Sequence, residues 1–146
     1  MQKVLDSKTS ATLCYCDSDH LKYVNDNYGH DKGDTYICDF VEILKSNIRE
    51  DDIIARLGGD EFCILFKNGS IDSISSKMEH INEEFSKHAI DYPQSFSFGI
   101  VYINGNEDTS LLKILQIADQ RMYAQKRTHK VTTIQVATFL TSYICL

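Results

Sequence analysis

Apolar residues recur along the chain at two spacings, and each spacing predicts one kind of element. Short continuous or alternating apolar runs predict strands, which we place at residues 11–16, 53–57, 62–66, 95–103 and 131–137. Apolar residues three and four positions apart predict amphipathic helices, which we place at residues 17–28, from about 34 to 48, at 70–88 and from 109 to about 127. The predicted order is β-α-α-β-β-α-β-α-β.

This order predicts an α+β fold. It suits a central antiparallel or mixed sheet with helices on one face, as in a ferredoxin-like sandwich. At 146 residues the chain is long enough for one domain with a full hydrophobic core, and no repeat, low-complexity segment or linker divides it. We therefore expect a single domain over residues 1–146.

The composition narrows the class of protein. Charged residues make up 25% and hydrophobic residues 42% of the chain, which is typical of a soluble globular domain. The net charge of -6 argues against a nucleic-acid-binding surface, because such a surface needs a basic footprint. The sequence shows no signal peptide and no apolar run of membrane-spanning length, so we expect no membrane contact by this domain.

The cysteines indicate a reducing, cytoplasmic location. Five of them lie within apolar runs, at Cys14, Cys16, Cys38, Cys63 and Cys145. Cys14 and Cys16 are too close for an easy disulfide and lack the two-residue gap of metal-binding or redox pairs. We therefore expect buried free thiols.

Candidate chemistry gathers first around the predicted hairpin of residues 53–66. Gly58 and Gly59 separate its two apolar runs and predict a tight two-residue turn, which needs the positive φ angles that glycine adopts. Asp60 and Glu61 follow directly, so the tip carries two carboxylates beside a bare backbone. That arrangement suits a metal-bound phosphate; a plain hairpin with solvated acids is the alternative.

A third carboxylate, Asp17, stands at the end of the first predicted strand. If the first three strands are neighbours, Asp17 and Asp60 converge, and carboxylates completed by water and phosphate oxygens are how proteins hold Mg²⁺. Two such ions would stabilise the attacking and leaving oxygens of a phosphoryl transfer. Lys22 lies on the next predicted helix, within reach of a phosphate. Lys126 and Lys130 lie four apart at the end of the last helix, where stabilising the helix C-terminus is the alternative role.

Four sequence blocks resemble the GGDEF family of diguanylate cyclases, in the right order and at the right spacing. They are Asp17-x-Asp-x-x-Lys-x-Val-Asn-Asp-x-x-Gly-His-x-x-Gly-Asp34, Gly58-Gly-Asp-Glu-Phe62 preceded by Arg56, Ser97-x-Gly99, and Ala118-Asp-x-x-Met-Tyr-x-x-Lys126. The resemblance covers about residues 11–131. It implies a nucleotidyl cyclase-like form of the α+β fold.

The resemblance also implies roles for individual residues. By similarity, two Mg²⁺ or Mn²⁺ ions per active site are held by Asp17, Asp60 and the backbone carbonyl of Ser18. The catalytic residues that it implies are Asp60, Glu61 and Lys22. Substrate contacts are implied for Leu21, Asn25, Asp34, Gly58, Gly59, Lys126 and Lys130. Among these, Asn25 and Asp34 would contact the guanine edge, and the lysines the triphosphate. Arg49 and Asp52 resemble the family's RxxD site, where product binds and inhibits.

These roles imply a reaction and its partners. Two molecules of GTP would condense into cyclic di-GMP and two pyrophosphates, with one GTP on each protomer of a homodimer. Cyclic di-GMP would be both product and inhibitor. Family members normally begin with a helix block that joins an upstream sensory domain, and residues 1–10 do not match that block. We therefore expect the chain to be the C-terminal part of a longer sensor protein.

Several positions depart from the family pattern. Ser18 stands where an apolar residue is usual, Arg121 and Gln125 replace small residues, and Lys130 replaces an arginine. Residues 139–146 are apolar and have no counterpart, so an added strand and a contact surface are both open. Two further functions also stay open: a catalytically silent GGDEF domain that senses GTP or cyclic di-GMP, and an interaction domain without a ligand.

Overall fold

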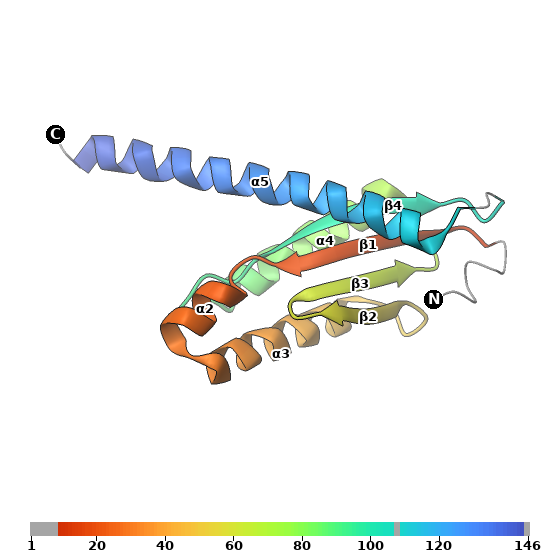
Figure 1. The fold of residues 1–146 in the computed structure, drawn as a ribbon, viewed down its shortest axis with the longest axis horizontal. Coiled ribbons are helices and arrows are strands. Elements are labelled where there is room, and N and C mark those ends of the chain that lie inside the picture. Colours follow the sequence, from red (N-terminus) through yellow and green to blue (C-terminus); the bar gives the residue numbers. More distant parts are fainter. Residues whose placement is uncertain (1–8, 107–108, 145–146) are drawn as a thin grey trace.

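The computed structural model describes residues 9–106 and 109–144, and in this part a four-stranded antiparallel sheet forms the centre of the chain (Figure 1). Side chains are described up to residue 128. The strands are β1 (Ala11–Ser18), β2 (Ile53–Gly58), β3 (Glu61–Phe66) and β4 (Phe96–Ile103), and they lie in the order β2-β3-β1-β4. β1 and β3 are therefore neighbours, as the predicted convergence of Asp17 with the hairpin requires.

Helices cover both faces of this sheet. They are α2 (Leu21–Tyr28), α3 (His30–Asn47), α4 (Ile71–Lys87) and α5 (Leu111–Ile144). The first three pack on the face that buries Cys14 and Cys16, whereas α5 packs on the face that buries Leu13 and Tyr15. Side chains alternate between the faces along a strand, so the continuous apolar run of β1 contributes to both cores. The expectation that helices cover only one face was wrong.

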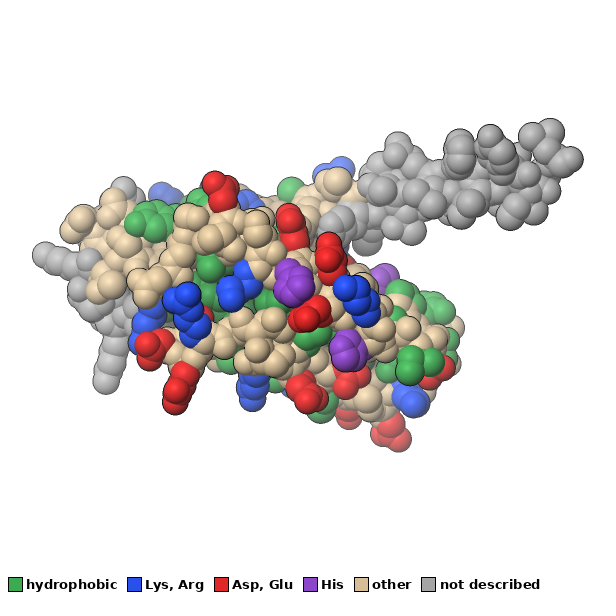
Figure 2. All heavy atoms as spheres, turned by 180° about the vertical axis from the view of Figure 1, so that it is seen from behind, with side chains coloured by type: hydrophobic (Ala, Val, Ile, Leu, Met, Phe, Trp, Pro, Cys, Tyr) green, Lys and Arg blue, Asp and Glu red, His purple; other side chains and the backbone are tan. Residues whose placement is uncertain are grey.

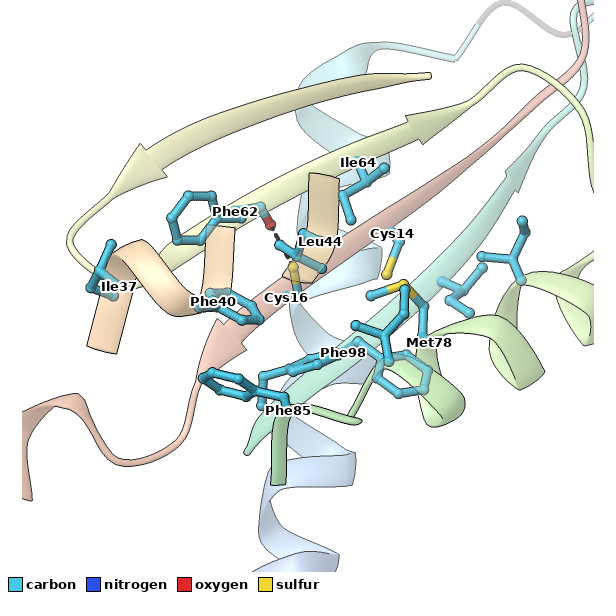
Figure 3. Close-up of a cluster of buried hydrophobic side chains, with 14 of the residues drawn as sticks. Cys14, Cys16, Ile37, Phe40, Leu44, Phe62, Ile64, Met78, Phe85 and Phe98 are labelled. Carbon is cyan, nitrogen blue, oxygen red and sulfur yellow. Dashed lines mark hydrogen bonds between the residues drawn. The ribbon is translucent and has the colours of Figure 1, made fainter. Parts of the chain in front are cut away.

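The larger core lies between the sheet and helices α3 and α4 (Figure 3). Phe40 of α3 packs edge-on against Phe62 of β3 and also lies beside Phe85 of α4, with ring centroids 5.3 Å apart in both pairs. Leu44 and Met78 belong to the same cluster and are fully buried. This packing fixes β3, and with it the tip of the hairpin, against α3.

Residues 131–137 continue α5 as a helix, so the predicted final strand was wrong. Valine, isoleucine and threonine are frequent in this stretch and favoured a strand, but such propensity depends strongly on context. The sequence has no glycine or proline after residue 108 that would end a helix once it has formed. The order in the described part of the chain is therefore β-α-α-β-β-α-β-α.

Gly29 separates α2 from α3, as its place after the first helical pattern predicted. Its φ of 89° ends α2, and α3 begins at His30 rather than near Asp34. The first turn of α3 is polar, so the spacing of apolar residues did not reveal it. The early start brings the two helices into a tight corner.

Among the described cysteines, Cys14, Cys16 and Cys63 are buried free thiols, as expected, but Cys38 on α3 is exposed. Burial raises the pKa of each buried thiol, so these three stay protonated near neutral pH. Cys145 lies outside the described residues.

The surface carries charges of both signs. On the face shown in Figure 2, acidic and basic side chains are intermixed rather than gathered into one basic patch, which agrees with the negative net charge. In the described part of the chain, no helix combines the length and the hydrophobicity needed to cross a membrane.

Candidate functional site

The hairpin turn consists of Gly59 and Asp60, one residue later than expected. β2 ends at Gly58 and β3 begins at Glu61, and these two residues face each other across the ladder. Gly59 has a φ of 37°, in the left-handed region that glycine adopts without strain. The shift follows from an irregularity between Arg56 and Gly58, which adds one residue to β2. Asp60 therefore lies in the turn itself.

Arg56 holds this turn in place. Its Nε and Nη2 atoms both donate to the carbonyl oxygen of Gly59, at 3.0 and 2.6 Å, and its guanidinium lies 5.8 Å from the ring centroid of Phe62. A planar guanidinium fixes direction better than an ammonium, because its N–H groups form a rigid fork. No role was predicted for Arg56, and its position beside the two glycines was the only sequence signal.

Three acidic residues meet where β1 ends beside the turn, as predicted. Asp17 faces Glu61 across the β1–β3 ladder, and the backbone N–H of Ser18 donates to the carbonyl oxygen of Asp60 at 3.2 Å. Burial raises the pKa of Asp17 to about 6; the Lys126 ammonium opposes this rise, and the charges of Asp60 and Glu61 add to it. We call Asp17, Asp60 and Glu61 the carboxylate centre. Its excess of negative charge would be stabilised by a cation.

Lys126 of α5 reaches the carboxylate centre. Its ammonium lies 2.8 Å from Asp17 Oδ1 and 3.9 Å from Asp19 Oδ1, with 22% of the side chain exposed. The Asp19 carboxylate also accepts hydrogen bonds from the hydroxyls of Ser95 at 2.8 Å and Ser97 at 2.7 Å. No role was predicted for Asp19 or for the two serines, although Asp19 and Ser97 lie within the quoted blocks.

The chemistry of the centre fits a hard divalent cation. Asp17 and Asp60 offer carboxylate oxygens, and Mg²⁺ is commonly bound through one or two carboxylates because it keeps several waters and takes phosphate oxygens. Among the described residues, no three or more His, Cys, Asp or Glu side chains, those of the carboxylate centre included, are close enough together to hold a metal ion by themselves. Lys126 instead pairs with Asp17, so one positive charge already lies at the centre.

The residues implied for the guanine edge lie together at the corner between α2 and α3. Gly33 packs so closely against Asn25 that a methyl group at residue 33 would overlap the Asn25 amide oxygen, and it would lie 3.3 Å from Leu21. Asp34 follows Gly33 and is exposed. The tight turn at Gly29 therefore brings Asn25 and Leu21 against Gly33, the residue that precedes Asp34.

The other two lysines assigned to the triphosphate are placed differently. The Lys22 ammonium lies 2.8 Å from Asp26 Oδ2 on the exposed side of α2, and this hydrogen bond raises the pKa of Lys22. Lys130 lies in α5, and its side chain is outside the described ones. Within the described side chains, Lys126 is the one of the three that the structure brings to the carboxylate centre.

Arg49 and Asp52 lie at the turn before β2, at the opposite end of that strand from Gly59. Asp52 Oδ2 accepts a hydrogen bond from the backbone N–H of Arg49 at 3.0 Å, and Asp52 Oδ1 accepts one from the N–H of Lys67 at 3.3 Å. The Arg49 side chain is exposed. Asp52 therefore stabilises the turn, and Arg49 projects from it.

Comparison with known proteins decides the family. Residues 1–132 match the family model described as diguanylate cyclase, GGDEF domain. The chain belongs to this family. Curated relatives of this GGDEF chain include the probable diguanylate cyclase DgcJ of Escherichia coli, 32% identical over 127 residues, and the diguanylate cyclase DgcP of the same bacterium, 35% identical over 130 residues. These matches cover 87% and 86% of the chain but only 25% and 38% of the two relatives.

Solved GGDEF structures share the fold. The GGDEF domain of DgcB from Caulobacter crescentus in complex with c-di-GMP matches with a TM-score of 0.77 at 25% identity, over 87% of this chain and 78% of that one. The active GGEEF domain of a diguanylate cyclase from Vibrio cholerae matches with the same TM-score and identity, over 87% and 83%. The α+β, nucleotidyl cyclase-like fold predicted from the sequence is confirmed.

Proposed function

We propose that this chain is the catalytic domain of a diguanylate cyclase, a nucleotidyltransferase that condenses two GTP into cyclic di-GMP and two pyrophosphates. The observation that supports it most is the carboxylate centre at the end of β1, with the Lys126 ammonium 2.8 Å from Asp17. Family membership and relatives named as diguanylate cyclases also support it. They do not favour the silent-receptor alternative.

In this proposal Asp17, Asp60 and the backbone carbonyl of Ser18 hold two Mg²⁺ or Mn²⁺ ions. When bound, the ions supply positive charge for the triphosphate and for the attacking oxygen. The raised pKa of Asp17 supports the assignment, because neighbouring carboxylates and burial disfavour its negative charge until more positive charge is near. Glu61, opposite Asp17, is our candidate to accept the proton of the attacking 3′-hydroxyl.

Cationic side chains and the open turn bind the phosphates. Lys126 exchanges its contact with Asp17 for the triphosphate tail, and Lys22 and Lys130 join it there. For Lys22 this requires release from Asp26, which is easy because the pair is exposed. Gly58 and Gly59 carry no side chains, so the phosphates can approach the backbone of the turn closely.

The corner between α2 and α3 selects the base. The Asp34 carboxylate accepts hydrogen bonds from N1–H and the exocyclic amine of guanine, a pair of donors that adenine lacks. Asn25 contacts the same guanine edge, and Leu21 packs beside it. Their local grouping around Gly33 supports this assignment.

Two protomers complete the reaction, since each holds one GTP and a 3′-hydroxyl of one attacks the α-phosphate of the other. Cyclic di-GMP inhibits by binding at Arg49 and Asp52, where the exposed guanidinium suits a phosphate or a guanine edge.

The same proposal includes a single GGDEF domain over residues 1–146, an upstream sensory domain in the native protein, and a cytoplasmic location.

Product formation tests the proposal. The purified chain is incubated with GTP and Mg²⁺ and analysed by mass spectrometry, with ATP as the control substrate and Asp60→Ala as the control variant. We expect cyclic di-GMP from the wild type with GTP, no cyclic dinucleotide from ATP, and no product from Asp60→Ala. A wild-type chain that binds GTP but forms no product at high protein concentration would overturn the enzymatic assignment.

A further inference from the structure

We infer that Gln125 and Arg121 are positioning residues, which fix α5 on β4 so that Lys126 reaches the carboxylate centre. The consequence for catalysis rests on the proposed function. The positioning itself is a property of the protein without nucleotide.

α5 crosses β4 in direct backbone contact. A Cβ atom at Gly99 would overlap the carbonyl oxygen of Ala118 and the backbone nitrogen of Met122. Side chains that interdigitate normally fix how one element lies along another, and Val101 and Ile103 of β4 pack in one apolar cluster with Ile114, Ala118 and Met122 of α5. Gly99 offers no side chain to the helix, so on the side of the crossing where Lys126 lies, polar groups beside the crossing supply the directional contacts.

Two long side chains of α5 supply that attachment. Gln125 Oε1 accepts a hydrogen bond from the backbone N–H of Phe98 at 2.6 Å, and Arg121 Nη1 donates to the carbonyl oxygen of Ile100 at 2.5 Å. β4 is the last strand in the order and pairs with β1 on one side only. Backbone groups of residues two apart point to the same edge of a strand, so both bonds form on the outer edge of β4.

This attachment lies next to the residue that needs positioning. Gln125 directly precedes Lys126, and the Phe98 to which it bonds directly follows Ser97, the residue that faces Asp17 across the ladder. The hydrogen bond between Gln125 and Phe98 therefore lies one residue from Lys126 along α5, and one residue along β4 from Ser97, the neighbour of Asp17. The small residues that the family pattern has at positions 121 and 125 can make neither bond.

A simpler role for Gln125 and Arg121 would be to cover the outer edge of β4. Asn82 of α4 also binds that edge, so it serves as the comparison. Its amide donates to the carbonyl oxygen of Phe96 and accepts from the Phe96 N–H, both at 3.0 Å. Asn82 and Gln125 line the same groove of about 420 Å³ beside β4. Asn82→Ala is therefore the matched control, because it removes bonds from the same strand edge without changing α5.

Acylation of lysines in the protein without nucleotide tests the positioning. Wild type, Gln125→Met, Gln125→Glu and Asn82→Ala are treated with limiting acetic anhydride, and mass spectrometry gives the rate at Lys126 relative to Lys22, whose side chain is 90% exposed. Met keeps the length of Gln but lacks its acceptor oxygen, whereas Glu keeps that oxygen. We expect acylation of Lys126 to become about three to ten times faster in Gln125→Met, as for the loss of one hydrogen bond. Gln125→Glu and Asn82→Ala should keep the wild-type rate.

The inference would be overturned if Lys126 were acylated in Gln125→Met at the same rate as in the wild type. It would also be overturned if the rate rose equally in Asn82→Ala. In the enzyme, Gln125→Met should raise the KM for GTP by a similar factor with kcat little changed, and it should add nothing in a Lys126→Met background. Failure of the proposed function would look different: wild type would form no cyclic di-GMP, while the acylation result would stand.

Discussion

At the scale of single residues, the ionised Asp17 carboxylate destabilises the folded protein at the position where the proposed function needs it. It lies at the end of β1 with only 14% of its side chain exposed, faces Glu61 and is close to the turn residue Asp60. Burial and these two charges outweigh the pairing with Lys126 and raise its pKa to about 6. Groups that are destabilised in the free protein are frequent at binding and catalytic sites, because their ligand relieves the cost.

Asp17→Asn should therefore stabilise the protein without nucleotide at pH 7.5. The folded pKa lies above the ordinary value of 3.8, so the ionised carboxylate lowers stability, increasingly as the pH rises towards about 6 and then constantly. We expect a gain of about 1–2 kcal/mol at pH 7.5 that disappears near pH 4, measured by urea unfolding. A lower free energy of unfolding for the variant at pH 7.5 would contradict this account of the site.

Substitutions of Arg49 and Asp52 should have the same effect on product inhibition but different effects on stability. Arg49→Ala removes an exposed side chain, so it should abolish inhibition by cyclic di-GMP and change the free energy of unfolding by less than about 0.5 kcal/mol. Asp52→Ala should abolish inhibition and also cost about 1–2 kcal/mol, because the N–H groups of Arg49 and Lys67 lose their acceptor. Inhibition of Arg49→Ala at wild-type strength would show that product binds elsewhere.

The sequence predicted which carboxylates meet, but it did not predict which lysine joins them. Asp17 and Asp60 lie at the ends of apolar runs, and such runs locate strands well. Lys22 follows Asp17 closely in the sequence, yet it pairs with Asp26, since residues four apart on a helix are neighbours. Lys126 comes from 109 residues away, a contact that only the packing of α5 on the sheet creates.

At the scale of elements, the errors have physical causes. The hydrophobic pattern located α5, but such a pattern does not say which face of a sheet a helix will cover. Residues 131–137 were assigned to a strand from their composition, although they extend a helix that meets no terminating residue. The turn moved by one residue because an irregularity in β2, which no local rule predicts, changed the register.

Gly99→Ala should disturb the contact between α5 and β4. The added methyl would overlap backbone atoms of Ala118 and Met122, so the helix must move, at a cost of about 1–3 kcal/mol in the free energy of unfolding. Gly58→Ala is the matched control, since the nearest atom to its added methyl is Glu61 Oε2 at 3.8 Å. Chemical denaturation of both variants measures the difference, and an equal loss would contradict the close crossing.

At the scale of the whole molecule, the residues of the proposed function lie in three separate regions of the fold. The carboxylate centre lies at the end of the sheet where β1 stops, the α2–α3 corner lies beyond it, and the Arg49 turn lies at the far end of β2. Each chain has one carboxylate centre among its described residues. In the proposed reaction each GTP is held by its own chain, so the reaction would require two chains.

Specific activity should accordingly rise with protein concentration and level off where dimers dominate. Cyclic di-GMP formed per protomer is measured across a dilution series, alongside the molar mass from light scattering. Adding excess Asp60→Ala chain should lower the activity of the wild type, because mixed dimers have one defective centre. Constant activity per protomer in samples shown to be monomeric would contradict the two-chain reaction.

Calorimetry can test the claim that the carboxylate centre binds GTP through a divalent metal ion. A non-hydrolysable GTP analogue is titrated into wild type, Asp17→Asn and Arg49→Ala at pH 7.5, with and without Mg²⁺. We expect Mg²⁺-dependent binding by wild type and Arg49→Ala, and at least about tenfold weaker binding by Asp17→Asn, as for the loss of a charged contact. Since Asp17→Asn should be the more stable protein, unfolding would not explain that loss. Equal affinity without Mg²⁺, or wild-type affinity in Asp17→Asn, would contradict the claim.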